Sequence, residues 1–179
     1  KDFIRSIQDY PKKGILFRDI TTLIKDEKAF TETINQIVER SKKFSFNKIA
    51  AIESRGFVFA SAISYILKKP FILLRKKNKL PADVHSVDFK LEYGTATIEV
   101  HKDSIDKNDS VLIIDDLIAT GGTAEAAAKL IEISGGKVSA FIFVINLFDL
   151  EGCDKLIKKN YKVENLIDFP GHWSSNLGL

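Results

Sequence analysis

Apolar residues gather in short uninterrupted runs rather than in alternation with polar residues. A strand covered on one face alternates, whereas a strand covered on both faces is a continuous apolar run, as in a parallel sheet. The runs therefore predict buried parallel strands. They span residues 49–52, 71–74, 111–114 and 141–145.

Stretches with helical character lie between these runs, and Gly135 and Gly136 follow the last stretch as a helix-ending signal. The order is strand, helix, strand, long insert, strand, helix, strand. This order predicts an α/β fold with a mainly parallel central sheet flanked by helices and joined by right-handed crossovers. The helical stretches span residues 29–42, 56–68 and 124–134.

The insert between the second and third runs has a different pattern. Residues 87–91 and 97–100 alternate polar with apolar positions, and Glu92-Tyr93-Gly94 lies between them. This pattern predicts an antiparallel excursion that serves as a flexible flap over residues 82–107. The first 24 residues are expected to be irregular, because Pro11 and Gly14 interrupt them.

Composition narrows the class of protein. A length of 179 residues, with 45% hydrophobic and 28% charged, predicts one globular domain over residues 1–179. A net charge of +3 is too small to indicate nucleic-acid binding. One cysteine, Cys153, excludes an internal disulfide, and no apolar stretch approaches the ~20 residues of a membrane span. We therefore expect a cytoplasmic protein without nucleic-acid or membrane partners.

Two local features leave two interpretations each. Arg75, Lys76, Lys77 and Lys79 form either a solvated loop or a site for an anionic ligand. Asp115-Asp116 follows the third apolar run, and is either a pair favoured by a helix N-terminus or a grip for the vicinal hydroxyls of a sugar.

The segment after the acidic pair is rich in glycine and hydroxyl groups, and a helix follows it. Ligands of open α/β sheets bind at the carboxyl ends of strands, where glycines let amides approach and a helix N-terminus favours anions. Residues 119–123 therefore predict a phosphate cradle beside a sugar site. The spacing matches neither Gly-x-x-x-x-Gly-Lys nor Gly-x-Gly-x-x-Gly, so nucleoside triphosphatase and dinucleotide-binding interpretations lose their main support.

The complete run from 111 to 123 is similar to the phosphoribosyl pyrophosphate motif of type I phosphoribosyltransferases. Five further blocks occur in order, and together they resemble the bacterial adenine phosphoribosyltransferase family over about residues 2–172. The blocks are 9–11, 14–20, 53–57, 75–81 and 91–94.

This resemblance implies the type I phosphoribosyltransferase fold, with a small hood from residues 1–24. It implies a purine salvage enzyme that converts adenine and phosphoribosyl pyrophosphate into AMP and pyrophosphate, with Mg²⁺, as a cytoplasmic homodimer. No direct protein ligand for the metal is certain, and Asp115 is a candidate through a bound water. The tail, residues 173–179, extends past the family's usual ending and has no interpretation.

The resemblance also assigns roles by position. Glu92 is the acid/base group and Arg55 a second catalytic residue. The residues that bind the 5-phosphate are Ala119, Thr120, Gly121, Gly122 and Thr123. Asp115 and Asp116 bind the ribose hydroxyls. The pyrophosphate site is Glu53, Ser54, Arg55, Gly56, Arg75 and Lys79, where the family often has a cis peptide. Phe17 stacks on adenine, and the backbones of Leu16 and Arg18 read its polar edge.

Alternatives remain at the level of function and of single residues. Another base is an alternative substrate, since phosphoribosyltransferases share the cradle. A DNA-binding regulator of the same fold is a second alternative, but it would need a basic module for which no residues are left.

Tyr93 either stacks on substrate or packs the flap. Three histidines lack metal-like spacing, and Cys153, in an expected surface helix, lacks a catalytic partner. The histidines are His85, His101 and His172.

Overall fold

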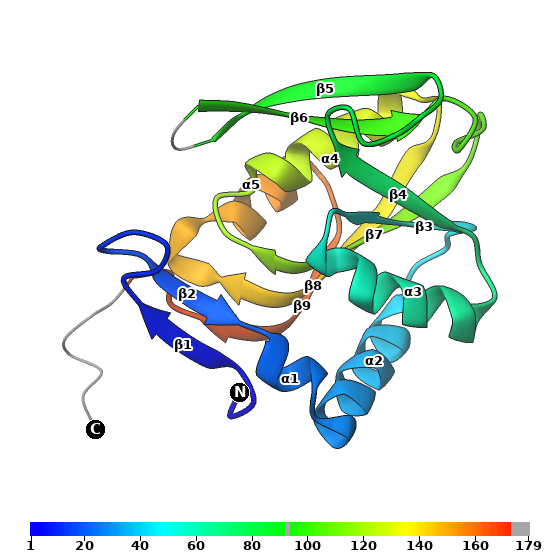
Figure 1. Ribbon diagram of the computed structural model, residues 1–179. Coiled ribbons are helices and arrows are strands. Elements are labelled where there is room, and N and C mark those ends of the chain that lie inside the picture. Colours follow the sequence, from blue (N-terminus) through cyan, green and yellow to red (C-terminus); the bar gives the residue numbers. More distant parts are fainter. Residues whose placement is uncertain (92–93, 173–179) are drawn as a thin grey trace.

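The computed structural model describes residues 1–91 and 94–172, arranged as a central sheet between two layers of helices (Figure 1). The strands are β1 (Arg5–Gln8), β2 (Leu16–Asp19), β3 (Lys48–Ile52), β4 (Phe71–Lys76), β5 (Val84–Leu91), β6 (Gly94–His101), β7 (Ser110–Ile118), β8 (Lys137–Leu147) and β9 (Val163–Phe169). The helices are α1 (Thr21–Ile24), α2 (Glu27–Ser41), α3 (Arg55–Leu67), α4 (Gly122–Ile133) and α5 (Gly152–Lys158), with a short 3-10 helix, η1 (Phe148–Leu150).

The main sheet has seven strands in the order β5-β6-β4-β3-β7-β8-β9. The strands from β4 to β9 in this order are parallel, whereas β6 pairs antiparallel with both β4 and β5. The predicted α/β fold with a mainly parallel sheet is therefore confirmed. The predicted antiparallel insert is also confirmed, and it extends the sheet at the β4 edge.

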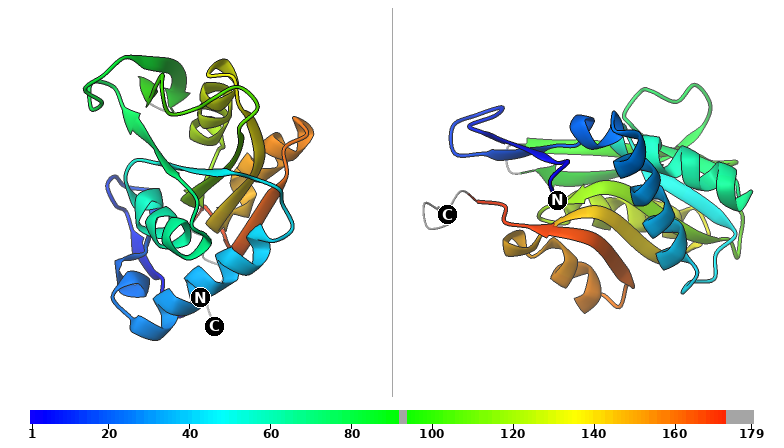
Figure 2. Two further views of the ribbon diagram at one scale, coloured as in Figure 1. Left: turned by 90° about the vertical axis from the view of Figure 1, so that its right-hand side faces the viewer. Right: turned by 90° about the horizontal axis from the view of Figure 1, so that it is seen from below.

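The apolar runs form strands because both faces of the sheet are covered. Successive strand residues point to opposite faces. Ile49 of β3 packs with Phe59 of α3 in one core, while its neighbour Ala50 packs with Leu130 of α4 in a second core. Helices α2 and α3 cover the first face, and α4 and α5 cover the second (Figure 2).

Local signals set the helix ends. The Asp26 side chain accepts a hydrogen bond of 2.8 Å from the Ala29 amide, which caps the start of α2. Helix α4 ends before Gly135, whose φ of +100° is the left-handed conformation that glycine adopts without steric cost. The predicted end of this helix is thus confirmed.

The amino-terminal segment is more regular than predicted. Strands β1 and β2 form a separate two-stranded antiparallel sheet, in which Ser6 is opposite Arg18. The Arg18 guanidinium donates to the Pro170 carbonyl at 2.8 Å and lies over the Phe169 ring at 4.4 Å. These contacts attach the small sheet to the end of β9, which the sequence pattern did not predict.

Helix α5 also differs from expectation. It was expected to be a surface helix carrying Cys153, but that residue is only 7% exposed. The Cys153 thiol lies 3.3 Å from the Asn146 side-chain oxygen and 3.4 Å from that of Asn165, which attaches α5 to β8 and β9. Burial raises the pKa of this thiol. No helix among residues 1–91 and 94–172 is long and apolar enough to span a bilayer.

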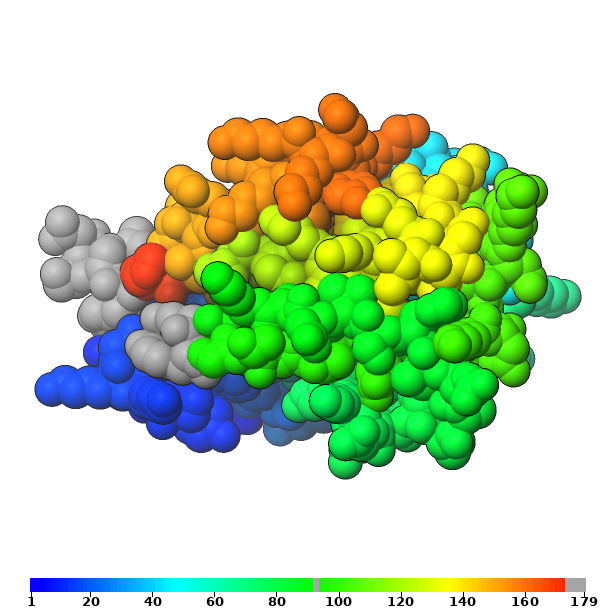
Figure 3. All heavy atoms as spheres, turned by 90° about the horizontal axis from the view of Figure 1, so that it is seen from above, coloured from blue at the N-terminus to red at the C-terminus, as the bar shows by residue number. Residues whose placement is uncertain are grey.

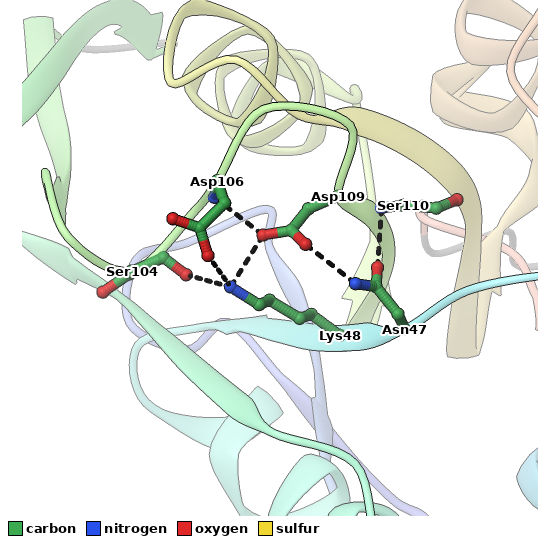
Figure 4. Close-up of polar contacts among 6 residues, drawn as sticks. All are labelled: Asn47, Lys48, Ser104, Asp106, Asp109 and Ser110. Atoms are coloured by element: carbon green, nitrogen blue, oxygen red, sulfur yellow. Dashed lines mark hydrogen bonds and ion pairs between the residues drawn. The ribbon is translucent and has the colours of Figure 1, made fainter.

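A polar cluster ties together the amino-terminal ends of β3 and β7 (Figure 4). The Lys48 ammonium lies 2.7 Å from an Asp109 carboxylate oxygen, and Asp109 is only 6% exposed. The second oxygen of Asp109 accepts from the Asn47 side-chain amide at 2.8 Å, and the first also accepts from the Asp106 amide at 2.7 Å. The cluster lies at the opposite end of these strands from the cleft described next.

Candidate active site

A cleft of about 260 Å³ opens at the carboxyl ends of β3 and β7. Helix α3 leaves β3 towards one face of the sheet, and α4 leaves β7 towards the other, so the chain itself forms a crevice between them. The cleft is lined by Ile52, Glu53, Ser54, Arg55, Asp115, Asp116, Leu117, Ile118, Ala119, Thr120, Gly121, Gly122, Thr123, Ala124 and Phe143. The structure thus gathers the predicted cradle, the acidic pair and most of the 53–56 loop around one cavity.

The segment from Ala119 to Thr123 forms the turn from β7 into α4. Gly121 has a φ of +88°, which favours glycine, and helix α4 begins at the next residue. The Gly121 carbonyl accepts a hydrogen bond of 2.9 Å from the Glu125 amide, as the first turn of a helix requires. The backbone amides of the first helical residues, before Glu125, have no partner within the helix and carry partial positive charge. This arrangement suits a phosphate group.

The acidic pair lies within β7 rather than after it, because β7 continues to Ile118. This placement is a correction to the predicted strand end, and it rejects the helix N-terminus as the reason for the pair. Asp116 is only 4% exposed, and its Oδ2 lies 2.9 Å from Arg55 Nε, yet this oxygen has no hydrogen-bond partner of good geometry among the described residues. It therefore retains the capacity to accept a hydrogen bond beside its ion pair with Arg55.

Asp115 is held beside Asp116 at the base of the cleft. Its Oδ1 accepts the Asp116 backbone amide at 2.8 Å. Burial, and then the charge of the Asp116 carboxylate, raise the pKa of Asp115 well above its usual range. Gly56 of α3 approaches closely, because a Cβ there would lie 2.9 Å from the same oxygen. A larger residue at Gly56 would therefore displace Asp115 or the adjoining β7 backbone.

The loop from Glu53 to Arg55 forms the second wall, and its Glu53–Ser54 peptide is cis. Glu53 accepts hydrogen bonds from the Arg75 guanidinium at 3.2 and 3.3 Å and from the Lys76 amide at 2.9 Å. Although burial acts against it, these donors hold the pKa of Glu53 below its usual range. Arg75 thereby lies beside Glu53 of the cleft wall, but neither Arg75 nor Lys79 lines the cleft itself. The Lys79 carbonyl accepts from the Arg75 guanidinium at 3.3 Å.

The predicted base-binding residues lie in β2, beside the cleft. The Arg55 guanidinium lies 5.4 Å from the centre of the Phe17 ring, so this arginine faces both the ring and the acidic pair. Tyr10 packs edge-on against Phe17 at 5.1 Å. Leu16 is buried, and the Arg18 side chain turns away to the end of β9.

Several singled-out residues lie elsewhere. Glu92 and Tyr93 fall outside the described residues, as does the tail at 173–179. His101 accepts the Ala82 amide at 3.3 Å, and His172 lies 3.1 Å from Asp149, both away from the cleft lining. Among residues 1–91 and 94–172, no three His, Cys, Asp or Glu side chains gather as a metal site.

The insert covers one side of the cradle. Strands β5 and β6 lie along α4 on the face that Figure 3 shows. A Cβ at Gly122 would meet the Lys90 carbonyl at 3.4 Å, so the end of β5 reaches the first turn of α4. The sequence pattern predicted the two strands but not this contact with the cradle.

Comparison with known proteins places this geometry in a family. Residues 20–174 match the model of the phosphoribosyl transferase domain. An adenine phosphoribosyltransferase of Pelagibacter ubique is 80% identical over 172 residues, which cover 96% of this chain and 98% of the relative. The chain belongs to the adenine phosphoribosyltransferase family. The resemblance seen in the sequence motifs is therefore confirmed.

Solved structures of adenine phosphoribosyltransferases share the fold. That of Thermoanaerobacter pseudethanolicus superposes with a TM-score of 0.90 at 45% identity, covering 94% of this chain and 96% of the other. That of Saccharomyces cerevisiae, in complex with adenine and an imino-altritol bisphosphate, gives 0.85 at 31% identity and covers 92% and 94%. The yeast enzyme therefore holds both a base and a phosphorylated sugar analogue on this fold.

Proposed function

We propose that the cleft holds phosphoribosyl pyrophosphate and adenine for the family's reaction, which gives AMP and pyrophosphate in purine salvage. One observation carries this assignment: the 119–123 cradle and the buried acidic pair line the same cavity. The cradle binds the 5-phosphate, and Asp115 and Asp116 accept hydrogen bonds from the ribose hydroxyls. We assign pyrophosphate to Glu53, Ser54 and Arg55 of the lining, and to Gly56, Arg75 and Lys79, which lie outside the lining.

The reaction breaks the bond between ribose C1 and the pyrophosphate oxygen, and the electron pair leaves with pyrophosphate. An imidazole nitrogen of adenine forms the new bond to C1 and releases its proton, for which we assign Glu92 as acceptor. General base help contributes about 10²–10⁴-fold, so the larger share comes from positioning and charge stabilisation. The Arg55 guanidinium lies between Asp116 and Phe17, where its positive charge can stabilise negative charge that develops beside the stacked base.

The residues present fit Mg²⁺, which prefers oxygen ligands and keeps several waters. Asp116 offers a buried carboxylate oxygen without a hydrogen-bond partner among the described residues, and Asp115 lies next to it. We assign Asp115 to the metal through a bound water, with the remaining ligands from substrate oxygens and water. When bound, Mg²⁺ neutralises negative charge on the departing pyrophosphate.

The whole chain serves this site as a single domain. We assign residues 1–24 as a hood over adenine, because Phe17 faces Arg55 from that segment. Residues 82–107 act as the flap that excludes water during transfer, since β5 reaches the cradle at Lys90. We place the enzyme in the cytoplasm, where its lone thiol stays reduced.

Turnover with different bases tests the assigned substrate. The purified enzyme with phosphoribosyl pyrophosphate and Mg²⁺ should prefer adenine to hypoxanthine, guanine and orotate by about 100-fold or more in kcat/KM, since buried polar groups reject a mismatched edge. Pyrophosphate release without base is the control. Preference for a 6-oxopurine would contradict adenine, and a structure with AMP whose phosphoryl group lay away from the 120–123 amides would contradict the site.

We propose a homodimer built on the exposed apolar face of α3. Val58, Tyr65 and Ile66 lie on this helix and are 37%, 86% and 47% exposed, and Leu73 of the neighbouring β4 is 40% exposed. Such a face is covered most simply by a second copy through two-fold symmetry. Light scattering should give a dimer for the wild type and for Thr31→Glu, at an exposed position of α2, and a monomer for Tyr65→Glu. A wild-type monomer would contradict this proposal.

A further inference from the structure

Helix α5 packs against the back of the phosphate cradle, although about thirty residues separate them in sequence. Two polar contacts join the two, and a third lies next to them. The Gly152 amide donates to the Ala119 carbonyl at 3.1 Å, and the Lys155 ammonium donates to the Thr120 carbonyl at 3.2 Å. Lys159 lies 2.9 Å from Glu125 in the first turn of α4. The contacts thus hold the first two residues of the cradle and the first turn of the helix that follows it.

The two backbones meet at a pair of glycines. A Cβ at Gly121 would lie 3.1 Å from both the Cα and the carbonyl oxygen of Gly152. A Cβ at Gly152 would lie 2.3 Å from the Ala119 carbonyl oxygen and 2.9 Å from the Gly121 nitrogen. Distances below 3.0 Å to backbone atoms require the backbone to move. The close approach of α5 to the cradle therefore depends on Gly152 as well as on Gly121.

These contacts fix the orientation of two peptide groups. In a trans peptide the N–H points opposite to the C=O. The carbonyls of Ala119 and Thr120 are held towards α5, so the amides of the same peptide groups, those of Thr120 and Gly121, point to the other side. Both residues line the cleft. Contacts from α5 thereby direct cradle amides towards the phosphate site.

Helix α5 is itself firmly anchored. Cys153 is buried against Asn146 of β8 and Asn165 of β9, and Leu156 is fully buried in the core beneath α4. A helix held in this way can transmit its position to the loop that it contacts.

We propose that the first turn of α5 positions the phosphate cradle, with Gly152 and Lys155 as positioning residues for phosphoribosyl pyrophosphate. This inference rests on the proposed assignment of residues 119–123 to the 5-phosphate. Lys155 also brings a positive charge next to that site, since it lines a neighbouring groove together with Thr120 and Gly122.

Steady-state kinetics of lysine variants test the proposal. Lys155→Met should raise KM for phosphoribosyl pyrophosphate by about 5–10-fold, as expected for the loss of one charged hydrogen bond to a partly exposed loop. The kcat, the KM for adenine and the melting temperature should stay within experimental error. Lys155→Arg should restore most of the affinity, and Lys158→Met, at an exposed lysine of the same helix, should change nothing.

Glycine variants give a second, independent measurement. Gly152→Ala should raise the same KM by more than about 10-fold, because the added methyl group forces the Ala119 carbonyl to move. Gly136→Ala is the matched control: its Cβ would lie 2.9 Å from Ile105, remote from the cleft lining. It should lower the melting temperature and leave KM unchanged. If Gly152→Ala does not fold, the lysine series decides.

The outcomes separate this inference from the proposed function. An unchanged KM for phosphoribosyl pyrophosphate in Lys155→Met, with an active wild-type enzyme, overturns the positioning role and leaves the proposed function intact. Equal losses for adenine and phosphoribosyl pyrophosphate would also overturn it, since they indicate a general structural effect. A wild-type protein that releases no pyrophosphate with adenine would instead contradict the proposed function.

Discussion

Asp116→Asn is expected to lower kcat/KM for phosphoribosyl pyrophosphate by about 100-fold or more. Hydrogen bonds to a charged group contribute ~1.5–3 kcal/mol each, and the proposed ribose grip loses the charge of one carboxylate. The amide also weakens the hold on Arg55, whose Nε lies 2.9 Å from Asp116 Oδ2. A factor of ten corresponds to ~1.4 kcal/mol, so the loss of these contacts accounts for about two factors of ten.

The stability of Asp116→Asn is expected to rise or to stay unchanged, although its activity falls. The charge of Asp116 helps to raise the pKa of Asp115, so ionisation of Asp115 costs folding free energy as pH rises above its unfolded value of ~3.9. The neutral asparagine removes part of this repulsion. Thermal unfolding at pH 7 should therefore give a melting temperature equal to or above that of the wild type.

The control for this substitution is Asp106→Asn, whose carboxylate is 80% exposed at the other end of the sheet. Its kcat/KM should match the wild type. A kcat/KM within about threefold of wild type for Asp116→Asn, or a large drop in its melting temperature, would contradict a ligand-binding role and favour a structural one.

Asp109→Ala is expected to have the largest effect on stability. Removing one partner of a buried ion pair costs ~3–5 kcal/mol, because the remaining charge is left without compensation. Here the substitution leaves the Lys48 ammonium with only the exposed Asp106 carboxylate at 3.2 Å and the Ser104 carbonyl at 3.1 Å (Figure 4). It also removes the acceptor of the Asn47 side-chain amide and of the Asp106 backbone amide. At ~2–4 °C per kcal/mol for a chain of this size, the melting temperature should fall by roughly 6–20 °C.

The same pair predicts how wild-type stability depends on pH. Although burial acts against it, the Lys48 ammonium lowers the pKa of Asp109, and the Asp109 carboxylate raises that of Lys48. The contribution of Asp109 is present above ~pH 4 and is lost as pH falls through its folded pKa. That of Lys48 is present below ~pH 10 and is lost as pH rises through its folded pKa. Denaturant unfolding across pH should show both losses reduced in Asp109→Ala.

Asp103→Ala, an exposed neighbour in the same loop region, is the control and should unfold like the wild type. Activity of Asp109→Ala at 25 °C should be unchanged, because the cluster and the cleft occupy opposite ends of β3 and β7. A melting temperature within 1–2 °C of wild type, at ~2–4 °C per kcal/mol, would contradict the importance of the pair.

Much of the fold could be predicted because the central strands are buried on both faces. The run at 49–52 reads as apolar throughout since Ile49 and Ala50 enter different cores. Strand β9, with the sequence VENLIDF, was missed because this edge strand has polar residues between apolar ones and lacks a continuous run. The hairpin of β1 and β2 is not predictable from the pattern, because Pro11 and Gly14 interrupt it and yet lie in the connection between two short strands.

The site was predictable where its residues follow one another in sequence. Residues 115–123 carry the acidic pair and the cradle in a single segment, so motif and cavity coincide. The contribution of α5 was not predictable in this way. Gly152 and Lys155 meet the cradle only through the packing of α5 on α4, and a glycine before a short helix has no distinguishing pattern.

The separation of the protein interior by its sheet has a consequence for how the molecule tolerates change. Ile49 and Ala50 point into opposite cores, so the sheet separates the two layers of side chains. Substitutions in the core beneath α2 and α3 therefore need not disturb the side chains beneath α4 and α5. The cleft is bounded by α3 from one compartment and α4 from the other. The shape of the cleft therefore depends on both layers. A change of packing in either layer affects function by changing the tilt of α3 relative to α4.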